Sequence, residues 1–405
     1  MKFIFLSEGE TAAGSTHEIR FWDLIEEVIH AERWGFDCFG VSEQHMAIGG
    51  ATTSAPEVLY SYLFAKTSRI RFRHAISLLP KNINHALKIA SRTAWEDILS
   101  HGRIELGVGR GNTTLALRAF EVDLDKTRGE WAEGLKVIQK AFTEDPFMFY
   151  GEHYKIPPRS LVPKHIQRPY PPLSTAATSP ESHVLAAEEF GIGVMSWSSF
   201  LGFDSLAESI AAYRKAADKK KSAGEYINDT VGVLVQGYCA DTDEKAVEEA
   251  GEQNLQWLRL AIDGYPRLAK LSKDYAYMND VKDVSHKLDD LDYFVNASGA
   301  AIFGSPDSCI RQIEKFRDIG ADEVLIRIDS VPHDRIMKTI EMFGRYVIPH
   351  FKRAENIVRP ADQVIADIRT MRDKAKEDGQ YVDLEKKPGA EEGKQKDAAQ
   401  PVTSS

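Results

Sequence analysis

An arginine between two glycines is the first candidate for binding chemistry in this sequence. Gly109-Arg110-Gly111 follows residues 104–108, a β-branched and apolar run with the composition of a buried strand. The glycines allow a sharp turn and a close approach, and a guanidinium offers a planar fork of donors to phosphate or carboxylate. Counted from Gly107 and Gly109, a Gly-x-Gly-x-x-Gly motif needs its third glycine at residue 112, which is Asn112. Arg110 is therefore a candidate anion-binding residue, with a solvated turn as the alternative.

Polar residues with chemical potential also follow other predicted strands. They are Glu43, Gln44, His45, residues 82–85, Thr178, Ser179, Ser196 and Trp197. The side chain of histidine titrates near neutral pH, so His45 and His85 are candidate acid–base groups. Glutamine can only donate and accept hydrogen bonds. Thr178 and Ser179 precede a predicted helix, where hydroxyl side chains commonly cap the first turn.

The elements that must position these residues alternate regularly. Strands are predicted at residues 3–7, 36–41, 70–79, 104–108, 173–177, 193–197, 230–239 and 323–328. Helices are predicted at residues 18–34, 56–66, 84–99, 126–142, 180–190, 204–222, 244–262, 307–319 and 333–348. Residues 300–303 are interpreted as a loop. Eight strand–helix units predict an α/β fold of the (β/α)8 TIM-barrel type, in which chemistry lies at the carboxyl ends of the strands.

Two long insertions and a charged terminus complete the predicted organisation. Residues 143–172 are rich in proline and aromatic residues, with a hairpin expected at residues 147–152, and residues 264–296 are expected to be irregular. Insertions of this length are commonly lids or interface elements. We expect a barrel domain at residues 1–354. Residues 355–405 are expected to form a charged helix that ends near residue 376, followed by a disordered tail.

Composition excludes several other classes of protein. The 405 residues carry a formal net charge of -10, which argues against electrostatic attraction to nucleic acid or an anionic membrane. Cys38, Cys239 and Cys309 are far apart, which argues against a disulfide framework and fits a reducing compartment. No zinc-ligand spacing, signal sequence or membrane-spanning run is recognisable. A cytoplasmic protein without a metal site is the expectation.

Four motifs, taken in order, carry a resemblance to a known family. Residues 31–37 and 42–45 read Ala-Glu-Arg-Trp-Gly-Phe-Asp and Ser-Glu-Gln-His, similar to Ala-Glu-x-x-Gly-Phe-Asp followed by Glu-His-His. Residues 99–111 contain matches to Leu-Ser-x-Gly-Arg and Gly-x-Gly-Arg-Gly. Arg128 falls in a third matching segment, and residues 304–306 resemble a late Gly-x-Pro. Over residues 1–350 the sequence resembles the bacterial-luciferase-like flavin-dependent monooxygenases.

The resemblance implies a fold, a cofactor and a set of binding residues. The fold is a TIM barrel that binds reduced FMN at its C-terminal face and activates O2 as a flavin C4a-peroxide. A separate NAD(P)H:flavin reductase usually supplies the FMNH2, and members tend to form homodimers or homotetramers. By position, the resemblance assigns the FMN phosphate to Arg110, Arg128, Thr178, Ser179 and Ser182. It places Ala75 in a non-proline cis peptide with Ile76 under the isoalloxazine, and Trp197 against the flavin.

One departure from the family pattern concerns proton chemistry. Gln44 replaces the first histidine of Glu-His-His, the residue most often assigned acid–base duty. The resemblance therefore leaves His45 and His85 as titratable catalytic candidates, with Gln44 restricted to hydrogen bonding.

The leading hypothesis is a two-component, reduced-FMN-dependent monooxygenase that hydroxylates a small organic substrate or inserts oxygen beside a carbonyl. The alternatives are an F420-dependent dehydrogenase on the same barrel and a flavin-binding protein without turnover.

Overall fold

Eight parallel strands close into a barrel within the first of two structural units, Met1–Lys352 and Arg353–Ser405. The computed structural model describes residues 1–12, 14–47, 51–197, 201–281, 286–355 and 361–379. The barrel strands, in order, are β1 (Lys2–Ser7), β2 (Cys38–Val41), β3 (Arg71–Leu78), β4 (Ile104–Gly109), β7 (Leu173–Ala177), β8 (Gly193–Ser196), β9 (Val231–Cys239) and β11 (Glu323–Arg327). Lys2 pairs with Glu323, so β11 closes onto β1. The predicted (β/α)8 TIM barrel is confirmed.

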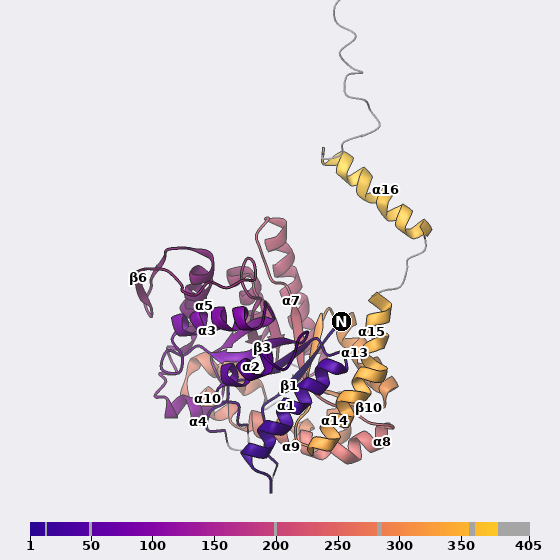
Figure 1. Ribbon diagram of the computed structural model, residues 1–405. Helices are drawn as coiled ribbons and strands as arrows, with labels where there is room; N and C mark the ends of the chain where they lie inside the picture. The colour runs from indigo at the N-terminus through magenta and orange to yellow at the C-terminus, as the bar shows by residue number, and fades with distance from the viewer. Residues whose placement is uncertain (13, 48–50, 198–200, 282–285, 356–360, 380–405) are drawn as a thin grey trace, which may run out of the picture. The chain divides into compact units, whose positions relative to one another are not determined.

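Helices follow the strands and surround the barrel in Figure 1. They are α1 (His17–Arg33), α2 (Pro56–Phe64), α3 (Ala86–Leu99), α4 (Thr114–Ala119), α5 (Thr127–Thr143), α6 (Pro180–Leu185), α7 (Phe203–Ser222), α8 (Asp243–Ala246), α9 (Glu252–Asp263), α13 (Pro306–Asp318), α14 (His333–Met342) and α15 (Ile348–Glu355). Single π-helical stretches, Ala186–Phe190, Val247–Gly251 and Phe343–Val347, extend α6, join α8 to α9 and join α14 to α15. Among the described helices, none is long and apolar enough to cross a membrane.

One predicted loop is a strand. Ala301–Gly304 forms β10, which pairs in parallel with Gln236–Cys239 at the outer half of β9. The nine residues of β9 are long enough to pair with β11 through Gly232–Gln236 and with β10 beyond that point. The loop interpretation was wrong because a four-residue apolar run has no periodicity that separates a strand from a buried turn.

The two insertions differ in how well their structure was predicted. The first contains the antiparallel hairpin of β5 (Phe147–Tyr150) and β6 (Lys155–Arg159), as expected. The second is not irregular, because it contains α10 (Tyr265–Leu271), the 3-10 helices Lys273–Val281 and His286–Asp289, and α12 (Leu291–Asn296). Asp290 caps α12 by accepting hydrogen bonds from the backbone of Asp292 and Tyr293. These helical pieces are too short to show a helical period in the sequence.

The terminal segment contains the expected charged helix, α16 (Ala361–Glu377). Residues 380–405, where a disordered tail was expected, lie outside the described residues.

The barrel interior has an ionic floor below an apolar layer. Near the amino ends of the strands, Arg73 contacts both Glu105 and Glu323, and Arg71 Nε donates to Glu105. Burial raises the pKa of Glu105, but the two arginines outweigh it and hold this pKa at about 2. Above this cluster lie the apolar side chains of Ile4, Leu6, Cys38, Ala75, Met195 and Leu325. The cavity that could hold a ligand lies at the opposite, carboxyl end of the strands.

Candidate active site

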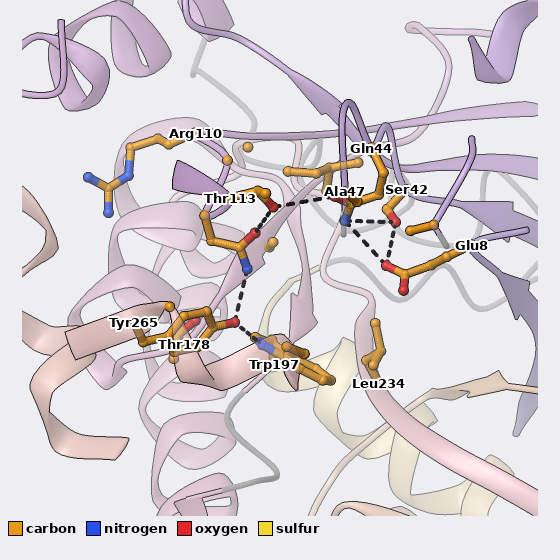
Figure 2. Close-up of a pocket in the computed structure, with 18 of the residues that line it drawn as sticks. Glu8, Ser42, Gln44, Ala47, Arg110, Thr113, Thr178, Trp197, Leu234 and Tyr265 are labelled. Carbon is orange, nitrogen blue, oxygen red and sulfur yellow. Dashed lines mark hydrogen bonds between the residues drawn. The ribbon is translucent and has the colours of Figure 1, made fainter. Parts of the chain in front are cut away.

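A cavity of about 890 Å³ opens at the carboxyl ends of the barrel strands. Glu8 follows β1, Ser42 follows β2, Arg110 follows β4 and Trp197 follows β8, and all four line the cavity (Figure 2). Its volume lies in the range of pockets that enclose cofactor-sized ligands. The position agrees with the general placement of active sites in TIM barrels.

The glycines before Arg110 are required by the close packing of β4 against β3. A Cβ atom at Gly107 would overlap the backbone oxygen of His74, and one at Gly109 would overlap the Ile76 side chain. Gly111 has a φ of +81°, in the left-handed region that favours glycine. These three glycines bring the backbone close to β3 and then turn it at the cavity wall.

Arg110 is held at this wall by the second insertion. Its Nη1 donates to the backbone oxygen of Asp274 at 3.1 Å, and its Nη2 donates to the Tyr277 hydroxyl at 3.2 Å. The guanidinium carbon lies 4.6 Å from the centre of the Tyr275 ring. Arg128, in the first turn of α5, is exposed and lines the same cavity, and its guanidinium makes no hydrogen bond or ion pair with the described residues. The structure therefore brings two predicted phosphate-binding cations to one cavity.

Thr178, Ser179 and Ser182 also line the cavity, and their polar groups form a helix cap. Ser179 Oγ accepts from the backbone N–H of Ser182 at 3.3 Å, and Ser182 Oγ accepts from the backbone N–H of Ser179 at 3.1 Å. This reciprocal capping box begins α6. The capping alternative is thus observed, and the cavity-facing position leaves the hydroxyls accessible to a ligand.

Two buried donors near the cavity have no partner. The Thr114 hydroxyl and Trp131 Nε1 are buried without a hydrogen bond among the described residues, and both residues line the cavity. Buried polar atoms in folded proteins are rarely left unpaired. Because both atoms are buried, the cations that face a ligand in the cavity are Arg110 and Arg128.

Gln44 forms a bridge between two walls of the cavity. Its Nε2 donates to Glu8 Oε1 at 3.3 Å and to Ser42 Oγ at 3.4 Å, and its Oε1 accepts from Thr113 Oγ1 at 3.4 Å (Figure 2). Among the described residues, the Gln44 side chain therefore bonds to two hydroxyl groups and one carboxyl group. The departure from the family's histidine produces a fixed amide at this position.

His45 lines the cavity and is oriented by Glu43. Its Nε2 lies 2.8 Å from Glu43 Oε1, and its ring packs edge-on against Phe120 at 4.9 Å. Burial raises the pKa of Glu43, but hydrogen bonds from His45, the Leu78 N–H and Asn84 outweigh burial and lower this pKa. Glu43 is therefore an ionised partner that fixes the imidazole, as in other carboxylate–histidine pairs.

His85 does not reach the cavity. Its Nδ1 accepts from the backbone N–H of Leu87 at 3.2 Å, which caps α3, and its ring packs 5.2 Å from Tyr154. Burial, followed by the charge of Lys81, lowers the pKa of His85. The structure gives His85 a helix-capping position and separates it from His45 and Gln44.

Ala75 lines the cavity, but its peptide bond is not the expected one. The cis peptide bonds of the described residues precede Pro146, Pro163 and Pro169, so the expected cis bond between Ala75 and Ile76 is wrong. The register of β3 against β4 shifts between His74 and Ser77. This bulge redirects the strand at the cavity floor with trans peptides.

A polar chain crosses the cavity from Trp197 toward Gln44. Trp197 Nε1 donates to the Tyr265 hydroxyl at 2.7 Å, and Asn112 Nδ2 donates to the same hydroxyl at 2.9 Å (Figure 2). Thr113 Oγ1 lies 3.5 Å from Asn112 Oδ1 and continues the chain to Gln44. Tyr265 belongs to the second insertion, so this insertion supplies a wall of the site as well as a support for Arg110.

Glu8 is a cavity residue that the sequence reasoning missed. Its Oε1 accepts from Ser42 Oγ at 2.8 Å, and its Oε2 lies 3.4 Å from Arg327 Nε. Burial raises the pKa of Glu8 although Arg327 and Ser42 oppose it, and the negative charges of Asp329 and Glu10 add to the rise. The available signal was its position directly after the first strand, the rule that identified the other site residues.

Comparisons with known proteins place this barrel in a family. Residues 1–323 match the luciferase-like monooxygenase family. The FMNH2-dependent dimethylsulfone monooxygenase of Pseudomonas putida is 25% identical over 82% of this chain and 88% of its own length. The oxygenase component of flavin-dependent trigonelline monooxygenase from Acinetobacter baylyi is 24% identical over 63% of this chain and 69% of its own.

Solved structures share the fold. Monooxygenase RslO1 from Streptomyces bottropensis has a TM-score of 0.71 and 23% identity over 87% of this chain and 100% of its own. The F420-dependent tetrahydromethanopterin reductase of Methanopyrus kandleri has a TM-score of 0.63 and 18% identity over 86% and 99%. The structural likeness alone therefore does not select a cofactor. The family match confirms the resemblance found in the sequence: the chain belongs to the luciferase-like monooxygenase family, a family of oxidoreductase enzymes.

Proposed function

We propose that this protein is the oxygenase component of a two-component system that uses reduced FMN and O2 to oxygenate a small organic substrate. The observation that carries the proposal is the pair of arginines that line one cavity. Arg110 and Arg128 both border a space large enough for a flavin nucleotide. The relatives that use FMNH2 or are named as oxygenase components support this choice of cofactor.

The two arginines fit a phosphate monoester. A phosphate carries about -1.5 to -2 charges near neutral pH, and arginine forks are strong partners for it. Arg110 has already two hydrogen bonds to the second insertion, which limit its motion, while its Nε–H has no hydrogen bond among the described residues. We assign the phosphate to Arg110 and Arg128, with hydroxyls from Thr178, Ser179 and Ser182 nearby.

The rest of the cavity suits the ring and the substrate. Leu6, Ala75, Ile76, Met195 and Leu234 form an apolar floor that excludes water from the reacting centre. Reduced FMN, when bound, supplies the two electrons that activate O2. Trp197 is assigned to contact the ring, in a position fixed by its hydrogen bond to Tyr265.

Two polar pairs supply hydrogen bonds and proton chemistry on the opposite wall. The Glu43–His45 pair presents an oriented imidazole to the cavity. Gln44 holds Glu8, Ser42 and Thr113 in place through the hydrogen bonds of its amide. Hydroxylation and Baeyer–Villiger insertion both need these functions, and the substrate decides between them.

A separate reductase is the proposed source of the reduced flavin. The trigonelline relative is named as one component of a larger system, which implies delivery of reduced cofactor from another protein in that case. We extend this arrangement to the present chain, with NAD(P)H as the reductant of the partner enzyme.

An anaerobic titration with chemically reduced FMN tests the cofactor assignment directly, and admission of O2 then tests turnover. We expect saturable binding of FMNH2, followed by O2 uptake and appearance of oxidised FMN. Reduced or oxidised F420, assayed with alcohols under anaerobic conditions, is the comparison. Hydride transfer to F420 without O2 uptake would establish the dehydrogenase alternative. Binding of FMNH2 without a substrate-dependent product across a broad panel would favour a flavin-binding protein without turnover.

A further inference from the structure

A buried cluster of acidic and basic residues borders the cavity on the side opposite Arg110. Arg327 contacts three carboxyl groups, with Nη2 at 2.6 Å from Glu10, Nε at 3.4 Å from Glu8 and Nη2 at 3.5 Å from Asp329. Its guanidinium also lies 3.8 Å from the centre of the Trp257 ring. Because Arg327 is fully buried, one positive charge is shared among three acids in a low-dielectric environment.

A second arginine extends the cluster without balancing it. Arg20 Nη1 and Nη2 donate to Glu27, and Arg20 Nη2 also donates to Asp329 at 3.1 Å. His333 Nδ1 lies 2.9 Å from Glu27, and the hydrogen bond to Glu27 raises the pKa of His333. Even with His333 charged, three cations face the four carboxyl groups of Glu8, Glu10, Glu27 and Asp329. Glu10 is partly exposed, so the buried part of the cluster has no surplus of positive charge, and burial disfavours each of its negative charges.

The supports of the four carboxyl groups are unequal. Asp329 accepts from Ser7 Oγ at 2.8 Å, from the Glu8 N–H at 2.7 Å and from Arg20. Glu27 has the Arg20 fork and His333, and Glu10 has the short contact to Arg327. Each of these three carboxyl groups has a charged hydrogen-bond donor.

Glu8 has the weakest charged support. It accepts from Ser42 Oγ at 2.8 Å and from Gln44 Nε2 at 3.3 Å, both neutral donors. Arg327 Nε, 3.4 Å away, is buried without a hydrogen-bond partner among the described residues. The charge of Arg327 therefore reaches Glu8 without a hydrogen bond. Glu8 lines the cavity and is linked there to Gln44 (Figure 2).

We propose that Glu8 is the proton donor of this active site: its carboxyl group holds a proton in the resting enzyme and transfers it to an oxygen atom that departs within the cavity. This inference rests on the proposed function. It gives the position next to Gln44 a titratable group, although the family's histidine is absent there. Gln44 and Ser42 are then positioning residues that orient the Glu8 carboxyl group.

The proton balance is closed within the enzyme. Without substrate, reduced FMN and O2 yield oxidised FMN and H2O2; with substrate, they yield oxidised FMN, the oxygenated product and water. In either case the O–H bond of Glu8 breaks while an O–H bond forms on the departing oxygen. The resulting carboxylate is stabilised by Ser42 and Arg327. It is protonated again by a proton that the cofactor releases when it becomes oxidised FMN.

Infrared spectroscopy of the protein without cofactor tests the first half of this proposal. We expect the wild-type chain at neutral pH to show the C=O stretch of a protonated carboxyl group, and Glu8→Gln to lose it. Glu18→Gln, which removes an exposed carboxyl group on α1, is the matched control and should retain the band. Absence of the band from the wild-type protein, or its persistence in Glu8→Gln, would overturn the proposal whether or not FMN binds.

Stopped-flow mixing of the FMNH2-loaded enzyme with O2 tests the second half and needs no substrate. We expect Glu8→Gln to bind FMNH2 as the wild type does but to form oxidised FMN about 100-fold more slowly. Glu8→Asp, which keeps a titratable group, should recover part of the rate and also serves if the glutamine variant misfolds. Unchanged oxidation in Glu8→Gln would overturn the donor role. Failure of the wild type to bind FMNH2 would instead refute the proposed function, while the infrared result would stand.

Discussion

Gln44 Nε2 donates to Glu8 Oε1 at 3.3 Å, so the amide that replaces the family's histidine is bonded directly to a buried carboxyl group. Thr113 Oγ1, 3.4 Å from Gln44 Oε1, holds the other end of the amide. The substitution therefore does more than remove a titratable ring. It ties a neutral side chain to an acid whose pKa is raised by burial, and the two residues form one unit at the cavity wall.

Substitution of Gln44 by histidine should return a titratable group to this wall. The rate at which FMNH2-loaded enzyme forms oxidised FMN should then change with pH around a midpoint of about 6.5, the ordinary pKa of histidine. Gln44→Leu, which cannot titrate, is the control. Stopped-flow measurements from pH 5.5 to about 8.5 compare the two variants. Identical pH profiles for both would show that this position does not contact the reacting centre.

Substitution of Gly109 by alanine should disturb the packing on which the Arg110 turn depends. The added Cβ would overlap the Ile76 side chain, so Ile76 must move within the buried floor. We expect a loss of about 1–3 kcal/mol in the free energy of unfolding, the usual cost of overpacking. Urea denaturation measures it. Gly264→Ala is the matched control, since a Cβ there meets nothing within 4 Å and its φ is -73°. Equal stability of the two variants would contradict this account of the glycine pattern.

His183 should make stability depend on acid pH. Its Nδ1 donates to the Ser179 backbone oxygen at 2.8 Å, and its Nε2 accepts from Ser196 Oγ at 2.9 Å. Burial lowers its pKa from 6.5 to about 4. The unfolded chain therefore takes up a proton between pH 6.5 and 4 that the folded chain refuses, and stability falls as the pH falls through this window.

The expected loss from His183 is about 3 kcal/mol between neutral pH and pH 4. Urea denaturation across that range, compared with His183→Gln, isolates this contribution from those of the carboxyl groups. The glutamine variant should show a shallower decline. Parallel curves for the two proteins would mean that His183 is not neutral in the fold.

The barrel was predictable from sequence because most of its strands are apolar runs buried on both faces. The turn at Gly109-Arg110-Gly111 was predictable because its glycines lie together in one short segment after a strand. The Glu8 cluster was not, because Glu8 and Asp329 are 321 residues apart and meet only when β11 closes onto β1. No spacing in the chain encodes that contact.

The expectation that His85 lies near the cavity was wrong for a related reason. Its position after a strand suggested a place at the barrel rim, but the strand end does not determine which way a loop side chain points. In the structure the ring caps α3 and packs on Tyr154, a residue that belongs to the first insertion. The predictions for residues 301–304 and 264–296 were wrong because each of these elements is too short to show its period in the sequence.

The central claim is that Arg110 anchors the phosphate of FMN, and an affinity measurement tests it. Anaerobic titration of FMNH2 should show at least about a 10-fold loss of affinity in Arg110→Ala, since a charge-assisted hydrogen bond contributes about 1.5–3 kcal/mol. Arg118→Ala, an exposed arginine on α4, is the matched control and should bind as the wild type does. Riboflavin, which lacks the phosphate, should bind wild type and Arg110→Ala equally. Unchanged FMNH2 affinity in Arg110→Ala would contradict the account.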